Sequence, residues 1–472
     1  MALPPRNHVV TGLGFGDEGK GTLTDFLVRE TGARAVVRYN GGPQAGHNVV
    51  DPDGRWHCFA QLGAGSFVPG TQTWLAPQML VELENLAVEA EVLAKKGVPQ
   101  PLADLTIDPD CTVVTPMHKM LGQLAEEARG SQRFGTCGMG VGEAVRGRER
   151  GEGLRVGDLL AGRCGLARLQ GLRDLAMARA DELLAQRPTE RMQELRRYFR
   201  DRCDPLRLFL RYCEILKRCR VSRLEGSLPP GPLVFEGAQG ALLDRCHGFA
   251  PFVTQSRATV HNALGLLGGA PATKVGVLRA YGHRHGQGPF PTEDGRLGKR
   301  LADPYNRENH WQGRFRLGRL DLVMLRYGVR LNGGVDWLAV TGLDRLSGLD
   351  TIRVCTSYSF EGDPKLLDGW TAWEARGRKG ARLLAITGRP DGLPPHASEA
   401  LLRCRPLDWL ALPGWRKDLR GCRRFEDLPS PARRLLALLE GERGLATPIG
   451  VVSVRPDAAG KLVAGGRSTR AD

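Results

Sequence analysis

The sequence predicts an α/β fold in which helices surround a mainly parallel sheet, and three local patterns support this class. Residues 8–14 form a short apolar, β-favouring run that ends in glycines, and residues 23–30 have the apolar spacing of a helix. A second such strand, at 35–39, is also followed by a glycine-rich loop. A strand, a glycine loop and a helix in this order are typical of β and α elements that alternate around a parallel sheet.

The remaining elements continue this alternation along the chain. Further strands are predicted at 101–115, 232–236, 273–281, 337–341 and 352–358, with a helix at 321–331. The segment 159–225 is rich in Leu, Ala, Arg and Glu with helical periodicity, which predicts a helical insertion packed on the sheet. Residues 377–395 predict a loop or hairpin, and residues 464–472 a frayed, disordered tail. We therefore expect a single domain over 1–472 that carries small subdomains.

The composition excludes several classes of protein. With 472 residues, 41% of them hydrophobic and 25% charged, the chain can bury a large core, which excludes disordered and collagen-like structures. It has no apolar run of the length, about 18 residues, that a membrane span needs, and no signal-peptide pattern. We therefore expect a cytoplasmic protein with no membrane partner. Its 11 cysteines lack CxxC spacing, which predicts reduced thiols and no disulfide framework or zinc ribbon.

The net charge of +15 raises nucleic acid as a partner. Only 11 of the 67 basic residues are Lys, and the charge is spread along the chain. The basic runs at 146–150 and 376–379 contain no aromatic residue on which a base could stack. An enzyme that binds nucleotide phosphates also needs positive charge, so we expect no nucleic-acid partner.

The first glycine loop has the spacing of a phosphate-binding loop. Gly14, Gly19 and Lys20 are placed so that backbone N–H groups can close round phosphates while the lysine supplies a charge. However, Gly21 stands where a Ser or Thr would hold magnesium, and Asp17 puts a carboxylate inside the loop. A carboxylate among phosphates fits a metal ligand or a catalytic base. On the loop alone, a glycine turn without a ligand is an equal alternative.

Six blocks of sequence resemble the adenylosuccinate synthetase family, in the family's order and over most of the chain. They are GDEGKG at 16–21, VVRYNGGPQAGHNVV at 36–50, GLRVGDL at 153–159, FEGAQGALLD at 235–244, GPFPTE at 288–293 and LPGW at 412–415. The resemblance implies a P-loop-like nucleotide-binding fold and a ligase of purine biosynthesis. Such a ligase uses GTP to join aspartate to C6 of IMP through a 6-phosphoryl intermediate, which forms a C–N bond. The resemblance also implies Mg²⁺ as cofactor and a homodimer.

The same resemblance assigns catalytic roles. It implies that Asp17 takes the N1 proton of the purine, that His47 stabilises the transferring phosphoryl group and that Gln239 orients the nucleotide base. Asp17 and the backbone of Gly46 would ligate magnesium. Without its setting, His47 would be an ordinary surface or packed imidazole. For GTP, the resemblance implies contacts with Gly16, Glu18, Gly19, Lys20, Gly21, Asp344 and Ser453.

Asp344 ends the segment 341–344, which matches the family's guanine-specificity block. Its carboxylate can accept two hydrogen bonds from guanine that adenine cannot offer, and the alternative is a turn residue that closes a strand. Gly342 replaces a lysine of the family. Arg455 replaces a glycine in the terminal contact that begins at Ser453. Nucleotide affinity or base preference can therefore differ from that of the family.

The predicted pocket for the substrate nucleotide departs further from the family pattern. Gln44 replaces an Asn, Cys137 replaces one of two Thr, and Gly151 aligns with an Arg that the family contributes across its dimer interface. Arg148 and Arg150 lie close to that last position and could restore it. The predicted contacts are Gln44, Thr136, Cys137, Arg150, Gln239 and Thr254.

For the amino-acid substrate the sequence predicts contacts with Gln312, Arg314 and Arg316. Guanidinium groups hold carboxylates through paired hydrogen bonds, which favours an acidic amine donor such as aspartate. Their alternative is an exposed charged turn. Trp311 and Gln312 replace a pair of Thr, and His285 replaces an aliphatic residue, so this pocket is expected to differ in shape.

These departures leave two alternatives to the IMP–aspartate reaction. The first is a paralogue that performs the same chemistry on another purine nucleotide or with another amine donor. The second, from another class, is a non-catalytic GTP-binding regulatory protein. The presence of Asp17, Lys20, His47 and Gln239 together argues against the second alternative.

Overall fold

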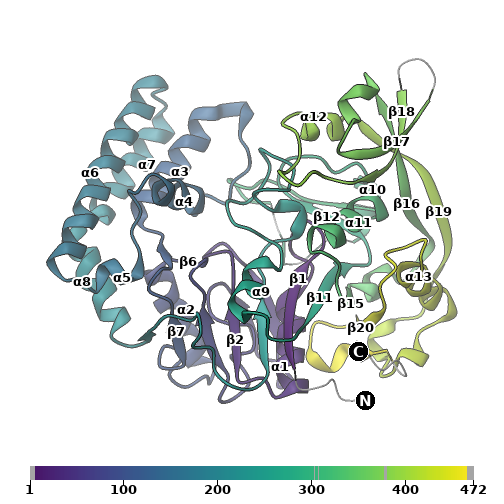
Figure 1. Ribbon diagram of the computed structural model, residues 1–472, viewed down its shortest axis with the longest axis horizontal. Coiled ribbons are helices and arrows are strands. Elements are labelled where there is room, and N and C mark those ends of the chain that lie inside the picture. The colour runs from purple at the N-terminus through teal and green to yellow at the C-terminus, as the bar shows by residue number, and fades with distance from the viewer. Residues whose placement is uncertain (1–5, 302, 304, 307, 377–379, 465–472) are drawn as a thin grey trace.

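A ten-stranded sheet forms the centre of the computed structural model, which describes residues 6–301, 303, 305–306, 308–376 and 380–464 (Figure 1). Neighbouring strands run parallel, except that β20 and β21 are antiparallel. The predicted α/β class with a mainly parallel sheet is confirmed. In sheet order the strands are β21 (Lys461–Val463), β20 (Ile449–Ser453), β15 (Trp337–Thr341), β11 (Ala272–Arg279), β1 (Asn7–Gly12), β10 (Leu233–Glu236), β2 (Ala35–Arg38), β5 (Gln72–Leu75), β7 (Leu105–Ile107) and β9 (Arg220–Val221).

Both faces of the central strands are buried, which explains their continuous apolar runs. Side chains alternate between the faces: Val9 packs in the cluster that contains α9 (His261–Leu267), and Val10 packs in the cluster that contains α1 (Lys20–Thr31). Phe235 and Val234 of β10 divide in the same way. The two helices therefore cover opposite faces of the sheet.

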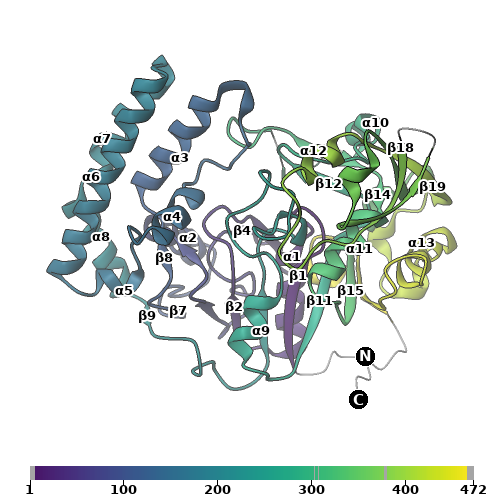
Figure 2. The same ribbon diagram turned by 45° about the horizontal axis from the view of Figure 1, so that its top comes forward.

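The predicted helical segment 159–225 contains separate helices, which stand at one end of the molecule together with α3 (Figure 2). Pro188 follows the end of α6, and Thr189 caps α7 by accepting a hydrogen bond from the amide of Met192. Asp204 caps α8, which has Pro205 in its first turn. The helices of this half are α2 (Leu83–Lys95), α3 (Pro116–Arg129), α4 (Val141–Glu149), α5 (Val156–Leu159), α6 (Arg163–Gln186), α7 (Glu190–Arg200) and α8 (Pro205–Leu216).

A second sheet, mostly antiparallel, lies at the opposite end of the molecule (Figures 1 and 2). The sequence did not predict this sheet. The strand predicted at 352–358 lies within β16 of this sheet and not in the main sheet, because β16 pairs along its length with β19, which follows it much later in the chain. The strands of the second sheet are β14 (Leu320–Asp321), β16 (Leu349–Glu361), β17 (Thr371–Ala375), β18 (Gly380–Ile386) and β19 (Cys404–Trp415).

Several local expectations can be compared with the smaller elements. The segment 377–395, predicted as a loop or hairpin, contains β18, which pairs antiparallel with β17; residues 377–379 lie outside the described residues. In the segment 101–115, β7 joins the main sheet, whereas β8 pairs with β6 and, through an isolated bridge at Thr112, with Arg155. Of the tail predicted at 464–472, only Ala464 is described, and its amide donates to the carbonyl of Gly450.

The remaining elements are short hairpins and helices: β3 (His47–Val50), β4 (Trp56–Phe59), β6 (Leu80–Val81), β8 (Thr112–Val113), β12 (Gly282–His285), β13 (Phe315–Gly318), α10 (Gly295–Arg300), α11 (Leu322–Leu331), α12 (Ala397–Leu402) and α13 (Ser430–Glu440). Within the described part of the chain, no helix is both long and apolar enough to cross a membrane. All 11 cysteines are free in the structure.

Candidate active site

The carboxyl ends of the central strands meet at one edge of the sheet, and the loops that follow them line a cavity of about 600 Å³, here called the main cavity. Ligands of open α/β sheets bind at this edge. Loops after β1, β2, β10, β11, β15 and β20 contribute to it. The residues predicted from sequence that line the main cavity are Gly16, Asp17, Glu18, Gly19, Lys20, Gly21, Gln44, Gly46, His47, Cys137, Gln239, Gln312, Asp344 and Ser453.

The first glycine loop is organised around the buried carboxylate of Glu18. Its Oε1 accepts hydrogen bonds from the amides of Gly14 (3.1 Å) and Gly16 (2.8 Å), and its Oε2 lies 2.6 Å from Nζ of Lys20. Burial alone would raise the pKa of Glu18, but the charges of Lys20 and His283 hold that pKa below its usual value. The carboxylate of Glu18 therefore serves the loop itself, and two amides expected to face phosphate are already engaged.

The start of α1 lies in the wall of the main cavity. Gly19 precedes the helix in the left-handed region (φ 93°) and offers no side-chain cap. A Cβ on Gly21 would stand 2.6 Å from Cβ of His47, which explains why no Ser or Thr follows Lys20. Because the first amides of a helix and its dipole attract anions, this end of α1 fits a phosphate group.

Asp17 occupies the left-handed region (φ 59°), which Asp tolerates better than most residues. Among the described residues, no hydrogen bond or ion pair engages its carboxylate. Its backbone carbonyl accepts a 2.6 Å hydrogen bond from Nε of Arg279, and the ring of His283 donates to the carbonyl of Gly16. The backbone is thus held from behind, while the Asp17 carboxylate stays free to act in the main cavity.

His47 begins β3 and forms a buried pair with Glu236. Nδ1 of His47 lies 2.6 Å from Oε1 of Glu236. The other carboxylate oxygen, Oε2, accepts a hydrogen bond from the amide of Ala64 and lies 3.7 Å from Nε of Arg38. Burial lowers the pKa of His47, although the Glu236 carboxylate opposes this shift. Burial would raise the pKa of Glu236, but the charges of His47 and Arg38 hold it below its usual value. Because Nδ1 is bonded to Glu236, Nε2 is the ring nitrogen available to a ligand.

Two amide side chains lie on neighbouring loops of the main cavity. Oε1 of Gln44 is buried without a hydrogen-bond partner, so it can accept a hydrogen bond from a ligand. Oε1 of Gln239 accepts a weak hydrogen bond (3.3 Å) from Ser256. The loops are tied together by Asn40, whose side chain accepts from the amide of Ala238 (2.7 Å) and donates to its carbonyl (3.1 Å).

Asp344, which follows β15, and Ser453, the last residue of β20, also line the main cavity. Burial raises the pKa of the half-buried Asp344 carboxyl. Gly342 has φ 65°, and a Cβ there would stand 3.1 Å from the ring of Tyr281, which also lines the cavity. The aromatic ring therefore fills space beside the position where the family has a lysine. Arg455, also in the wall, is paired with Asp457 at 3.0 Å.

Several predicted contacts lie outside the wall of the main cavity. Arg150 is 44% exposed at the end of α4 and pairs with Glu152. Thr136 is exposed, and Thr254 lies behind Gln239, with its hydroxyl 3.3 Å from that of Ser256.

Neither predicted arginine for the amino-acid substrate reaches the wall of the main cavity. Arg314 is exposed. The guanidinium of Arg316 donates to the carbonyls of Gly286 and Gly288 and pairs with Glu293 at 3.0 Å. Three of its five N–H groups are therefore engaged by the neighbouring turn and by Glu293, and its contact with a substrate carboxylate stays a prediction.

The sequence analysis assigned no role to several residues that line the cavity or contact residues in its wall. Glu236 was part of a recognised block but received no role, although a carboxylate at the carboxyl end of a buried strand is itself a signal. Arg279 ends β11, donates to Asp17 and pairs with Asp303 at 2.8 Å. Trp56 and Tyr305 also line the cavity, with their rings stacked 6.4 Å apart.

A helix N-terminus with a lysine, a free carboxylate and a buried His–carboxylate pair, all at the carboxyl edge of a parallel sheet, define an α/β enzyme that acts on phosphorylated ligands. A family model described as adenylosuccinate synthetase matches residues 9–460. The adenylosuccinate synthetase of Desulforudis audaxviator is 35% identical over 459 residues, which cover 95% of this chain and 96% of that protein. That of Halothermothrix orenii is 32% identical over 455 residues, which cover 95% and 96%. The chain belongs to the adenylosuccinate synthetase family of GTP-dependent ligases, as its sequence blocks predicted.

Solved structures share the fold. The fully ligated adenylosuccinate synthetase from Plasmodium falciparum matches with a TM-score of 0.70 and 24% identity, over 97% of this chain and 99% of that one. The succinoaminodeoxyadenylate synthetase of cyanophage S-2L, solved with dGMP and dATP, matches with a TM-score of 0.55 and 16% identity, over 98% and 96%. At these identities the likeness shows the fold alone.

Proposed function

We propose that this chain transfers the γ-phosphoryl group of GTP to O6 of IMP and then lets the amine of aspartate displace phosphate. The products are adenylosuccinate, GDP and phosphate. The observation that carries this proposal is the meeting, in one cavity, of the free Asp17 carboxylate, the His47–Glu236 pair and the first turn of α1. The Asp17 carboxylate can take a proton, the His47–Glu236 pair can stabilise charge on the phosphoryl group, and the first turn of α1 can hold phosphate.

In this mechanism Asp17 takes the proton from N1 of the purine, so that O6 becomes nucleophilic. Its carboxylate is suited to this because no protein donor occupies it within the described residues. Phosphate beside Nε2 of His47 adds negative charge, which favours the imidazolium, and Glu236 supports that form from Nδ1. The imidazolium then donates a hydrogen bond to the transferring group.

A magnesium ion fits the oxygen donors beside this proton-transfer site. Asp17 offers a carboxylate without a protein partner, and Gly46 of the same wall offers a backbone carbonyl; oxygen ligands of this kind suit Mg²⁺. When bound, the ion would neutralise charge on the GTP phosphates. Lys20 supplies a further positive charge beside the helix N-terminus, and its contact with phosphate requires it to share or leave Glu18.

For the bases, we propose that Asp344 accepts hydrogen bonds from guanine and that the ring of Tyr281 supplies the flat surface beside it. Tyr281 takes this role because it fills the space next to Gly342. Ser453 closes the same end of the cavity. Gln44, with its unpartnered Oε1, and Gln239 contact the substrate nucleotide, with Thr254 supporting Gln239 through Ser256.

For the aspartate side chain we propose Arg314 and Gln312. Arg314 has no carboxylate within ion-pairing distance among the described residues, whereas Arg316 is engaged by Glu293. Thr136 and Cys137 are proposed, as in the sequence analysis, to contact the substrate nucleotide. We also propose a cytoplasmic homodimer. In it the exposed Arg150, which lies outside the main cavity of its own subunit, contacts the substrate nucleotide in the partner subunit's site.

The test is phosphate release from GTP and magnesium with IMP and aspartate present together or one at a time, and with the product identified by mass. We expect phosphate and adenylosuccinate only when both substrates are present. GTP binding without any stimulated turnover on purine nucleotides would support the non-catalytic alternative instead.

A second candidate function is the same chemistry on another purine nucleotide. The changes at Gln44, Cys137 and Trp311 favour it, and the cyanophage enzyme of the same fold was solved with dGMP. The same assay with GMP, dGMP and dIMP in place of IMP separates the two functions by the nucleotide with the highest kcat/KM.

A further inference from the structure

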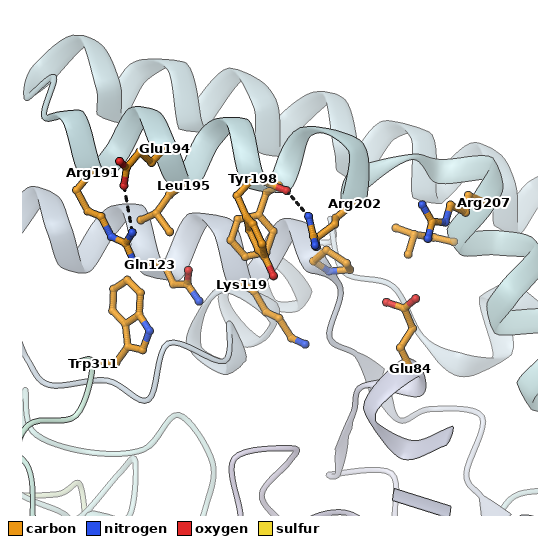
Figure 3. Close-up of a pocket in the computed structure, with 13 residues that line it drawn as sticks. Glu84, Lys119, Gln123, Arg191, Glu194, Leu195, Tyr198, Arg202, Arg207 and Trp311 are labelled. Atoms are coloured by element: carbon orange, nitrogen blue, oxygen red, sulfur yellow. Dashed lines mark hydrogen bonds and ion pairs between the residues drawn. The ribbon is translucent and has the colours of Figure 1, made fainter. Parts of the chain in front are cut away.

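The helical end of the molecule contains a second cavity, with a volume of about 710 Å³. It lies between α3 on one side and α7 with the start of α8 on the other (Figure 3). None of its lining residues belongs to the main cavity. Its volume falls within the range of small-molecule sites, about 300–1,000 Å³.

The charges on the wall favour an anion. Four cationic side chains and two carboxylates face this cavity. Arg202 and Arg207 have no carboxylate within ion-pairing distance among the described residues, and Arg202 donates only to the carbonyl of Tyr198 (2.9 Å). Two guanidinium groups without acidic partners suit a phosphate, which accepts paired hydrogen bonds. The six charged residues are Glu84, Lys119, Arg191, Glu194, Arg202 and Arg207.

An aromatic surface lies beside these cations. The ring of Tyr198 is in the middle of the cavity in Figure 3, and the residue is 53% exposed. Cζ of Arg202 lies over this ring, 3.8 Å from its centre, and the ring of Phe199 is perpendicular to it with centroids 4.9 Å apart. Because Arg202 covers one face of the ring, a flat base would stack on the opposite face. Phosphate binding and stacking together are the recognition chemistry of a nucleotide.

The cavity also contacts two loops of the main cavity. Nε2 of Gln123 donates to the carbonyl of Gly138 (3.0 Å), and a Cβ on Gly138 would lie 2.8 Å from the ring of Trp311. Gln123 and Trp311 line the second cavity. Cys137, the neighbour of Gly138 in the chain, and Gln312, the neighbour of Trp311, line the main cavity. A ligand that moves Gln123 or Trp311 therefore moves groups of the substrate-binding region.

We propose that the second cavity binds a nucleoside diphosphate and that its occupation changes substrate affinity in the main cavity. The phosphates would lie on Arg202 and Arg207, and the base on Tyr198. The regulatory half of this inference rests on the proposed function, whereas the binding half does not.

Binding is tested by calorimetry with ADP as the probe, in the presence of saturating IMP. GDP is not added, because it is itself a nucleoside diphosphate and would fill the second cavity. Any ADP that binds in the main cavity is common to all variants, so the second cavity is measured from the difference between them. The variant Arg202→Gln/Arg207→Gln removes the two unpaired guanidinium groups. Its matched control is Arg163→Gln/Arg218→Gln, which removes the same charge from exposed positions of the helical segment outside the second cavity. Thermal melting and light scattering check that all three proteins share fold and assembly.

We expect the cavity variant to bind ADP at least about 10-fold more weakly than the wild type and the control, because each charge-assisted hydrogen bond contributes strongly. Tyr198→Leu should weaken ADP about 5-fold or more and leave ribose 5-phosphate unchanged. Equal binding of ADP to the wild type and the cavity variant would overturn the proposal. So would inorganic phosphate that binds as tightly as ADP, because it would show an anion site without base recognition.

The regulatory half is tested by the KM values for the nucleotide and amino-acid substrates, measured with and without ADP. We expect ADP to change at least one KM about 5-fold or more in the wild type and not in Arg202→Gln/Arg207→Gln, whose basal activity should be normal. Unchanged KM values in a wild type that binds ADP would overturn regulation while leaving the binding site. A protein without ligase turnover that still binds ADP at this cavity would refute the proposed function and not the site.

Discussion

Glu236→Gln removes the charge that supports His47 while keeping the size of the side chain. The two residues meet through a buried 2.6 Å hydrogen bond, with His47 7% exposed and Glu236 fully buried. A buried hydrogen bond to a charged group contributes about 1.5–3 kcal/mol. At about 1.36 kcal/mol per tenfold change, its loss from the transition state lowers kcat about 10- to 150-fold.

The variant also changes the pH dependence in a defined direction. Glu236 raises the pKa of His47 against the effect of burial. Without the carboxylate that pKa falls, so the imidazolium is lost at lower pH. Because the proposed mechanism uses the imidazolium, the alkaline limb of the kcat profile should move to lower pH. Adenylosuccinate formation, followed by absorbance from pH 5.5 to 9, measures the limb.

Glu236 also lies near the buried Arg38, so the variant is expected to lose stability as well as activity. Glu89→Gln is the matched control: Glu89 is another buried carboxylate, accepts from the amides of Ala60 and Gln61 and lies 3.8 Å from His57, outside the main cavity. It should lower the melting temperature without shifting the pH limb. A folded Glu236→Gln enzyme with near-normal kcat and an unmoved limb would refute the reasoning.

Four further predictions follow from single positions. Asp17→Asn, which keeps a residue tolerant of φ 59°, should lower GTP-dependent phosphate release at least about 1,000-fold with an unchanged circular dichroism spectrum; substantial turnover would exclude Asp17 as the base. Gly21→Ser should push His47 away, since the new Cβ would lie 2.6 Å from that of His47, and lower the unfolding free energy by about 1–3 kcal/mol in urea titrations; a neutral effect would contradict the close approach. Asp344→Asn should reduce the preference for GTP over ITP, measured as a ratio of kcat/KM, about 10-fold or more, and an unchanged ratio would remove Asp344 from guanine recognition. Burial lowers the pKa of Lys461 to about 7, below its value in the unfolded chain, so the unfolded state binds the extra proton between about pH 7 and 10.5 and stability rises with pH in that window. The unfolding free energy of the wild type minus that of Lys461→Met should therefore increase by up to about 2.7 kcal/mol from pH 7 to 9, and a constant difference would mean that Lys461 keeps an ordinary pKa.

The sequence by itself determined the elements whose signals are local. The apolar run of β1, the glycine loop and the apolar spacing of α1 lie within about 25 residues, so their order could be read directly. The same holds for β2, β11, β15 and α11, which the structure places close to their predicted bounds. The recognised sequence blocks also determined the family, and most of their predicted site residues line one cavity.

Only the tertiary structure decided which distant residues meet. His47 and Glu236 are 189 residues apart, and nothing local to either one names the other as a partner. The pairing of β16 with β19, which creates the second sheet, likewise depends on strands separated by another hairpin.

Tertiary contacts also decided what side chains are free to do. Glu18 and Arg316 have the residue types expected for ligand binding, but the chain itself uses the Glu18 carboxylate and three of the five N–H groups of Arg316. Asp17 and Oε1 of Gln44, in contrast, lack protein partners within the described residues. The sequence supplies the chemical groups because they belong to single residues. Whether a group faces a ligand depends on the hydrogen bonds and burial that the folded chain imposes on it, and those arise only when distant segments pack together.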